Sequence, residues 1–353
     1  MNIYNSRQWI EDLDHIIDSF PWMKAYAGKS VMITGIGGLV CSAVADLLIR
    51  YNETHEEPVT VVAAARSRER IRERFGIYFD RPYFHFTQYD ATKPELSIPC
   101  AVDYIIHGAG NSSPDRITKE PVETMLSNIT GLYELLQYSR ENHVTRLLYI
   151  SSSEVYGKKQ DSLPFREDQY GYIDILDARN SYSVGKSAAE TLCVSFADEY
   201  GTDSVIIRPG HIYGPAVTKY DLHVSSKWAR DAAGGRDIVM KSDGSQIRSY
   251  CYCLDSAAAI LTVLLQGENC RAYNISNPDS IISIREMAEI LAKSGGVRLE
   301  SELPTEEERK SFNPMSNSSL DSGSLLALGW HGCFDAETGF DHTVRILREM
   351  HSL

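Results

Sequence analysis

The sequence predicts an α/β protein of the Rossmann type, with a doubly wound parallel sheet and a smaller C-terminal α/β domain that binds the substrate. Short apolar runs alternate with helical segments, and these runs are apolar throughout, as in parallel sheets that helices cover on both faces. The first run leads into a glycine-rich turn that opens a helix, the local order of a dinucleotide-binding unit. The length of 353 residues allows two such parts.

The predicted elements follow in order from residue 31. We expect strands at 31–34, 59–65, 103–109, 146–151 and 203–209, and helices at 39–51, 121–142, 181–200, 254–266 and 283–294. Between 210 and 250 the periodicity loosens and Gly, Ser and Asp are frequent. We therefore predict a dinucleotide-binding domain over 29–209 and a mainly substrate-binding domain over 210–353, of which about 250–280 returns to the first domain.

The N-terminal residues 1–28 precede this pattern and are predicted to form a helical extension. Apolar side chains recur at helical spacing, with acidic residues between them; they are Trp9, Ile10, Leu13, Ile16, Ile17 and Phe20. A signal peptide would have a basic start and an uninterrupted apolar stretch. We expect an amphipathic helix that packs on the main body or on another subunit.

Composition and charge exclude several classes of protein. The net charge of −13 and the lack of a basic stripe argue against nucleic-acid binding. No apolar stretch is long enough for a membrane span. The seven scattered cysteines fit reduced thiols in the cytoplasm, and the Cys251/Cys253 pair lacks the partners of a zinc site, so we expect no metal.

The turn after the first strand carries the dinucleotide signal. Gly35, Gly37 and Gly38 precede Leu39, which opens the helix, and Cys41 stands in the place of a third glycine. Glycines allow the backbone to approach a pyrophosphate closely, and the helix N-terminus offers free N–H groups. An ordinary glycine-rich turn is the alternative. Cys41 indicates a small, tolerated increase in side-chain size where helix and strand pack.

The end of the second predicted strand bears on the choice of cofactor. An acidic residue there binds the ribose of NAD, but the sequence has Arg66 followed by Ser67 and no acid. Arg66 could meet the 2′-phosphate of NADP, which favours NADP over NAD. Arginines that open a solvated helix are the alternative explanation.

Tyr182 and Lys186 lie four residues apart, on one face of a predicted helix. A nearby ammonium lowers the pKa of a tyrosine and makes it a usable base. The same spacing occurs at Tyr89 and Lys93, so spacing alone is weak. The segment 150–157, ISSSEVYG, precedes Tyr182 by about 30 residues; a serine-rich segment after an apolar run is also typical of an ordinary strand-to-loop transition.

Seven motifs occur in the order found in one enzyme family. They are TGIGGLVC (34–41), HGAG (107–110), NITG (128–131), SSSEVYG (151–157), YSVGK (182–186), RPGHIYGP (208–215) and DGSQIRSYCYCLD (243–255). Because these motifs follow that order, the chain resembles the extended short-chain dehydrogenase/reductases that modify nucleotide sugars. The resemblance covers roughly residues 29–332. The resemblance implies NAD or NADP held tightly, a nucleotide-diphosphate sugar as substrate, and a homodimer through helices at about 121–142 and 181–200.

The resemblance also assigns residues. It implies that Ser152 contacts the sugar 4-hydroxyl, that Tyr182 removes its proton, and that Lys186 holds the nicotinamide ribose and lowers the pKa of Tyr182. Further positions follow from the motifs: Asp90, His107 and Ala109 beside the cofactor, and Ser112, Ser153, Arg208, His211 and Arg248 beside the substrate. For both arginines a structural salt bridge is the alternative.

Glu154 and Ser153 bear on the reaction type. Family members that eliminate water have an Asp before this Glu, and Ser153 stands there instead. We therefore expect a 4-epimerase that works through a transient 4-keto sugar. A uronate decarboxylase, whose serine segment is similar, and a 4,6-dehydratase are alternatives. Two further alternatives are an NADPH-dependent keto-sugar reductase and a cofactor-sensing protein without catalysis.

Overall fold

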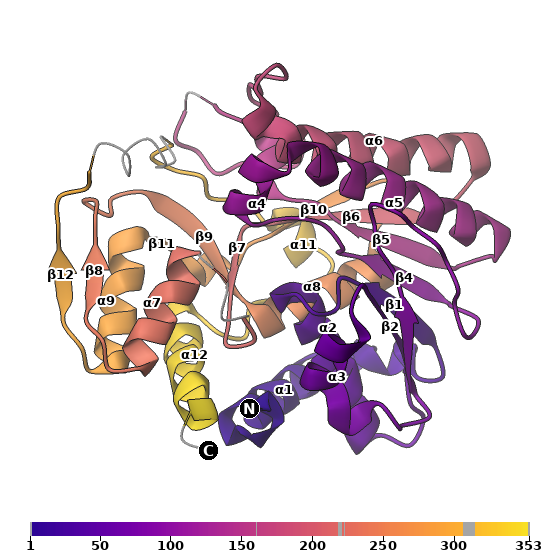
Figure 1. The fold of residues 1–353 in the computed structure, drawn as a ribbon, viewed down its shortest axis with the longest axis horizontal. Coiled ribbons are helices and arrows are strands. Elements are labelled where there is room, and N and C mark those ends of the chain that lie inside the picture. The colour runs from indigo at the N-terminus through magenta and orange to yellow at the C-terminus, as the bar shows by residue number, and fades with distance from the viewer. Residues whose placement is uncertain (1, 160, 218–220, 222, 306–314, 352–353) are drawn as a thin grey trace.

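The computed structural model describes residues 2–159, 161–217, 221, 223–305 and 315–351 of the chain. Seven parallel strands form its main sheet, in the order β10-β6-β5-β4-β1-β2-β3 (Figure 1). The strands are β1 (Ser30–Thr34), β2 (Thr60–Ala65), β3 (Phe84–Gln88), β4 (Tyr104–His107), β5 (Arg146–Ile150), β6 (Ser204–Pro209) and β10 (Ala272–Ile275). The predicted doubly wound parallel sheet is confirmed. Strand order reverses beside β1 and β4, where sheets of this kind bind ligands at the carboxyl ends of the strands.

Helices cover both faces of this sheet. In Figure 1, α5 (Pro121–Glu141) and α6 (Ser181–Tyr200) lie together above the sheet, and α2 (Leu39–Thr54) and α8 (Cys253–Gln266) lie below it. Successive residues of β1 serve the two faces: Val31 and Ile33 belong to the apolar core with α2 and α8, and Met32 to the core with α5 and α6. This alternation explains why the strand is apolar throughout.

Two small sheets and several helices of the described ranges make up the part to the left in Figure 1. The sheets have the orders β11-β9-β7 and β12-β8. These strands and helices are β7 (His211–Tyr213), α7 (Val224–Ala233), β8 (Ile238–Met240), β9 (Ile247–Tyr252), β11 (Ile281–Ser283), α9 (Ile284–Gly295), β12 (Leu299–Ser301) and α12 (Ala336–His351). The chain returns to the main sheet between β9 and β11, through α8 and β10. A short helix, α11 (Gly323–Leu326), lies near β10.

The expected amphipathic helix at the N-terminus is present as α1 (Arg7–Ser19). The Ser6 hydroxyl accepts a hydrogen bond from the N–H of Trp9 and caps the helix. Its apolar face is fully buried at Trp9, Leu13 and Ile16, and packs against α2, α8 and α12. The N-terminal segment therefore contacts both the helices of the main sheet and the last helix of the chain.

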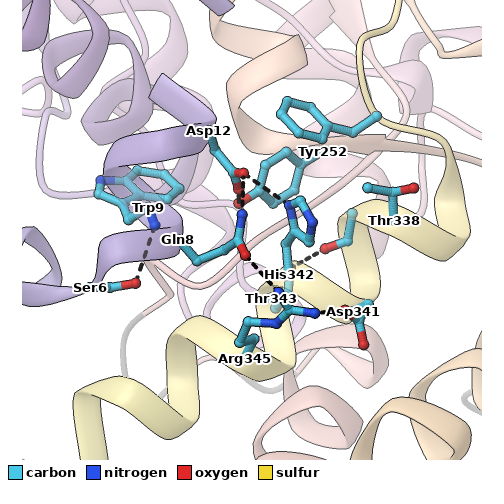
Figure 2. A network of polar contacts seen from close by, with 12 residues as sticks. Ser6, Gln8, Trp9, Asp12, Tyr252, Thr338, Asp341, His342, Thr343 and Arg345 are labelled. Carbon is cyan, nitrogen blue, oxygen red and sulfur yellow. Dashed lines mark hydrogen bonds and ion pairs between the residues drawn. The ribbon is translucent and has the colours of Figure 1, made fainter. Parts of the chain in front are cut away.

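A buried carboxylate fixes α1 in this position. Figure 2 shows Asp12 between Gln8, Tyr252 and His342. The Tyr252 hydroxyl donates to Asp12 Oδ2 over 2.9 Å, the Gln8 amide donates to Oδ1 over 3.0 Å, and His342 Nδ1 lies 2.9 Å from Oδ1. Arg345 of α12 also donates to the Gln8 amide oxygen. These bonds join α1 to β9 and to α12.

Two kinds of feature are absent from the described ranges, a membrane-spanning helix and a cluster of metal ligands. None of their helices combines the length and the apolar character needed to cross a bilayer. Within the same ranges, no three His, Cys, Asp or Glu side chains are grouped as ligands of a metal ion.

Candidate active site

The glycine-rich turn connects β1 to α2 at the crevice of the main sheet. Gly35 has φ +70°, and a Cβ there would lie 2.7 Å from the carbonyl carbon of Gly108 in the loop after β4. Both its conformation and this close approach require glycine. A Cβ on Gly37 would lie 3.3 Å from Ile71 Cδ1. Because these glycines have no side chains, a ligand can lie directly against the backbone of the turn.

The N-terminus of α2 faces the same crevice. Gly38 is the N-cap residue and provides no side-chain hydrogen bond, so the first helical N–H groups, beginning at Leu39, have no cap. Free N–H groups at a helix start fit a pyrophosphate. The Cys41 thiol lies where a side chain on Gly108 would be, since a Cβ there would come within 2.4 Å of Sγ. Cys41 is therefore accommodated because residue 108 has no side chain.

Charged side chains lie at the ends of β2 and β3. Arg66 is exposed directly after β2, and Asp90 follows β3. Asp90 Oδ1 accepts hydrogen bonds from the N–H and hydroxyl of Thr92 over 3.0 and 2.8 Å. Burial acts to raise the pKa of Asp90, but these bonds and the charge of Arg66 hold it below its usual value. Arg66 and Asp90 are thus neighbours at one end of the crevice.

His107 does not lie where we expected it. It is fully buried at the end of β4, with Nδ1 2.8 Å from the Thr34 hydroxyl and its ring stacked on Tyr149. The Thr34 hydroxyl also accepts from the N–H of Ala109. A cofactor in the crevice cannot reach the His107 ring; instead, this contact fixes the ends of β1 and β4, while Ala109 remains partly exposed.

The serine segment and the Tyr/Lys helix meet at the carboxyl end of β5. Ser152 is the N-cap of a short 3₁₀ helix, η4 (Ser153–Tyr156), and its hydroxyl accepts from the N–H of Glu154 over 3.2 Å. Tyr182 lies in the first turn of α6, close enough to Ser152 for the serine hydroxyl to affect the pKa of the phenol. Lys186 Nζ donates to the Ile150 carbonyl over 2.7 Å and lies 5.7 Å from the centre of the Tyr182 ring. Ser152, Tyr182 and Lys186 are therefore brought together.

The pKa values of this trio differ from our expectation. Burial raises the pKa of Tyr182 to about 12, although the Ser152 hydrogen bond lowers it. Burial also lowers the pKa of Lys186 to about 7. The predicted lowering of the Tyr182 pKa by Lys186 is therefore not found in the chain by itself, where desolvation of the phenolate is the largest effect and Lys186 is not among the groups that shift this pKa.

Glu154 and Arg248 form a second group at the same site. Glu154 is exposed in η4; the protein around its carboxyl raises its pKa, and the charge of Arg248 opposes this. Arg248 is buried in β9; its Nη1 donates to the carbonyls of Ile247 and Met315, whereas Nε and Nη2 have no acceptor among the described residues. His211 is an exposed residue at the start of β7; the protein around its ring and the charge of Arg248 lower its pKa.

The sequence comparison decides the family. Residues 31–276 match the NAD dependent epimerase/dehydratase family. The chain belongs to this family. It is 27% identical to the low-salt glycan biosynthesis protein Agl12 of Haloferax volcanii over 316 residues, which are 89% of this chain and 97% of that protein. It is 31% identical to UDP-glucuronic acid decarboxylase 3 of Arabidopsis thaliana over 261 residues, covering 73% and 72% of the two chains.

Solved structures agree with the fold of this family. The UDP-glucose 4-epimerase of Thermotoga maritima with UDP-glucose superposes with a TM-score of 0.74 at 21% identity, over 91% of this chain and 99% of that one. Family membership confirms the resemblance to enzymes that modify nucleotide sugars with NAD or a related cofactor. The Gly35 turn, the uncapped start of α2 and the partly free Lys186 amine are the features that fit such a dinucleotide.

Arg208 is a correction to the expected substrate contacts. It is 2% exposed, and its Nε and Nη2 donate to the two carboxylate oxygens of Glu190 over 3.0 and 2.6 Å. Nη1 donates to the Tyr156 hydroxyl, and Nη2 also donates to Tyr170. Every nitrogen of the guanidinium therefore has an internal acceptor, so Arg208 is the structural ion pair that we gave as the alternative.

The remaining predicted residues lie at the rim of the site or just inside it. Ser112 is exposed in the loop between β4 and α4 (Pro114–Lys119), and Ser153 is partly exposed at the start of η4. A cavity of about 1070 Å³ lies behind η4 and is lined by Val155, Glu190 and Arg208 among others, but neither Ser152 nor Tyr182 lines it. The trio therefore faces the crevice, and this cavity is a separate space.

The sequence analysis missed Glu190. Among the described residues, Glu190 is the one carboxylate that touches both the serine segment and Arg208, since Ser151 Oγ donates to Glu190 Oε1 over 2.5 Å. The signal was present, because Glu190 follows Lys186 by four residues and so shares its face of α6.

Proposed function

We propose that the chain oxidises a nucleotide-diphosphate sugar transiently at C4 and returns the hydride from the same cofactor, with 4-epimerisation as the net reaction. The convergence of Ser152, Tyr182 and Lys186 at the carboxyl edge of the sheet is the observation that carries the proposal. Oxidation of an alcohol needs a base at the hydroxyl and a hydride acceptor beside the carbon. Ser152, Tyr182 and Lys186 supply the base, and the crevice beside them fits the cofactor that accepts the hydride.

Each residue has a separate task. Tyr182 accepts the proton of the sugar 4-hydroxyl, and Ser152, whose hydroxyl lies beside Tyr182, holds that hydroxyl against it. The nicotinamide supplies hydride acceptance and return and, when oxidised, a positive charge that favours the phenolate. Lys186 holds the ribose with the N–H bonds that remain beyond its bond to Ile150. Because the pKa of Tyr182 is about 12 without a cofactor, Tyr182 is an effective base only in the loaded enzyme.

The cofactor in this proposal is NADP held through turnover. Arg66 is exposed at the end of β2, where its guanidinium can bind a 2′-phosphate in a bidentate way. Arg66 lies close enough to Asp90 to lower the pKa of the Asp90 carboxyl. The negative charge of Asp90 would therefore partly repel that phosphate. Stoichiometric NADP released from the purified protein supports the retained-cofactor reaction, whereas NADPH that washes out supports a keto-sugar reductase.

The choice of epimerase depends on Ser153. A dehydratase needs an acid at this place to protonate the leaving hydroxyl, and a serine hydroxyl is too weak an acid. Epimerisation needs only the trio and a substrate that can turn in the site.

Decarboxylation of a nucleotide uronate is the second candidate, and the Glu154/Arg248 pair favours it. Arg248 has N–H groups that find no acceptor among the described residues and suit a carboxylate, and Glu154, whose pKa is raised, would donate a proton to the carbon that loses carbon dioxide. The decarboxylase from Arabidopsis at 31% identity supports the same candidate. No basic residue occurs between Met315 and Ser322 to add to this site, and 313–314 lie outside the described residues.

Incubation with UDP-glucose and UDP-glucuronate, followed by mass spectrometry of the products, separates these reactions. An unchanged mass with a new retention time indicates an epimerase, loss of carbon dioxide a decarboxylase, and loss of water a dehydratase. We expect Tyr182→Phe to lower turnover by about 100-fold or more while cofactor remains bound. Near-normal turnover of Tyr182→Phe would contradict the proposed mechanism.

A further inference from the structure

Glu190 connects the two segments that carry the trio. It lies on α6 one turn after Lys186 and two turns after Tyr182, and only 8% of it is exposed. One carboxylate oxygen accepts from Ser151 on the serine segment, and both accept from Arg208 on β6. Three elements thus meet at one buried carboxylate.

Arg208 extends this connection to the other end of η4. Its Nη1 donates to the Tyr156 hydroxyl over 3.1 Å, and that hydroxyl donates to Asn274 of β10 over 2.5 Å. Ser151 precedes η4 and Tyr156 ends it. Ser152 and Glu154 therefore lie between two tethers that both lead to the Glu190/Arg208 pair.

Glu190 is also the charged neighbour of Lys186. The Glu190 carboxylate raises the pKa of Lys186 against the larger effect of burial. The other titratable groups around the amine are neutral near pH 7, because desolvation raises the pKa of Cys41 to about 12 and lowers that of His107 to about 3, and Tyr149 and Tyr182 are protonated phenols. Among the described neighbours, Glu190 therefore favours the ammonium form on its own.

We propose that Glu190 is a positioning residue of this enzyme, which holds the Ser152 segment against α6 and favours the charged form of Lys186. The proposal rests on the function proposed above, but its two parts can be tested separately from turnover. The tether acts through Ser151 and Arg208. The charge acts through space on Lys186.

Two variants separate the tether from the charge. Glu190→Gln keeps the size of the side chain and an oxygen for Ser151 but removes the negative charge. Ser151→Ala removes the tether to the serine segment and keeps the charge. Glu199→Gln, a change of an exposed glutamate on the same helix, is the matched control.

The first measurement is the pH at which Lys186 is half ionised. Competitive acetylation with acetic anhydride over a range of pH, read by peptide mass spectrometry, gives this midpoint. In Glu190→Gln we expect the midpoint to fall by roughly one pH unit, because the ammonium loses its counter-charge. Ser151→Ala and Glu199→Gln should keep the wild-type midpoint. An unchanged midpoint in Glu190→Gln would overturn the electrostatic part, whether or not the enzyme turns over any sugar tested.

The second measurement is turnover with the sugar that the wild-type protein accepts. We expect Ser151→Ala to lower kcat by about 10-fold at an unchanged pH optimum, since Ser152 is less well placed, whereas Glu199→Gln keeps the wild-type rate. Equal rates in Ser151→Ala and Glu199→Gln would overturn the tether. Glu190→Gln leaves the Arg208 charge buried without its partner, so this variant can fail to fold. In that case the double variant Glu190→Gln with Arg208→Met, which removes both charges, takes the place of Glu190→Gln in the acetylation experiment. A wild-type protein without turnover but with the expected midpoints would contradict the proposed function alone.

Discussion

Lys186 illustrates how a site residue opposes folding. The residue is 6% exposed and its pKa is lowered to about 7, which means that burial disfavours its charged form. A residue that destabilises the fold and yet lies beside Tyr182 is typical of a functional position.

We predict that Lys186→Met stabilises the protein and inactivates it. Methionine keeps the apolar stem of the side chain without its charge. The free energy of unfolding near pH 6 should therefore rise by about 1 to 2 kcal/mol, a net value that includes the loss of the hydrogen bond to Ile150. Turnover should fall by about 100-fold or more.

The pH dependence of this gain has a definite sign. Between about pH 7 and the ordinary lysine pKa, the unfolded chain binds a proton that the folded chain does not, so the wild-type protein gains stability as the pH rises through this window. The advantage of Lys186→Met should therefore shrink toward pH 9, as urea unfolding at several pH values would show. An advantage that grows with pH would contradict this account.

Residues of the site were predictable where a local pattern carries them. The spacing of Tyr182 and Lys186, and the place of Gly35 between strand and helix, are visible in sequence. The burial of Arg208 is not, because its acceptors come from α6 and from the segment before it, and only the tertiary fold brings these together. His107 was misplaced for the same reason, since its motif does not show which way a ring at the end of a strand points.

At the scale of elements, the strongly apolar strands of the main sheet and the helices α2, α5, α6 and α8 were predictable, and two strands of the main sheet were missed. β3 has the sequence FHFTQ and lies at the edge of the sheet, so its polar residues are tolerated. β10 has only four residues and joins the sheet through pairing with β6. Neither has an apolar run long enough to identify it before the sheet is assembled.

The attachment of α1 gives a prediction at this scale. Asp12 is 2% exposed and bonds with Gln8, Tyr252 and His342 (Figure 2). Asp12→Ala leaves these groups without their acceptor, and we expect a loss of about 2 to 4 kcal/mol in the free energy of unfolding.

The control is the next residue along α1. Glu11 forms an exposed pair with Arg7, so Glu11→Ala should change stability by less than about 0.5 kcal/mol. Chemical denaturation of both variants compares them directly. Equal effects would mean that the Asp12 bonds do not hold α1 to the rest of the molecule.

At the scale of the whole molecule, the fold class was predictable because alternating strands and helices leave few topologies. The division of the chain near residue 209 stays a prediction. The structure adds that the chain crosses between its two parts more than once, through β9, α8 and β10, and that α1 contacts both. A single cut in the sequence therefore does not describe how the parts are connected.

We expect a homodimer through the outer face of α5 and α6. These helices pack side by side, and apolar side chains on them are exposed: Val122, Leu126, Tyr133, Val194 and Tyr200. An apolar face on two adjacent helices suits a second copy related by a two-fold axis. Leu126→Arg should give a monomer in size-exclusion chromatography with light scattering. Leu163→Arg, at an apolar residue exposed in a loop, should keep the oligomeric state of the wild type, and the same state in both variants would contradict this interface.

The central claim is that hydride leaves C4 of the sugar and returns to it within one active site. A substrate with deuterium at C4, incubated with the purified protein without added cofactor, tests it most directly. We predict a product that keeps the deuterium at C4 and a primary isotope effect on the rate. A product without the label, or turnover that requires added NADPH, would contradict the account.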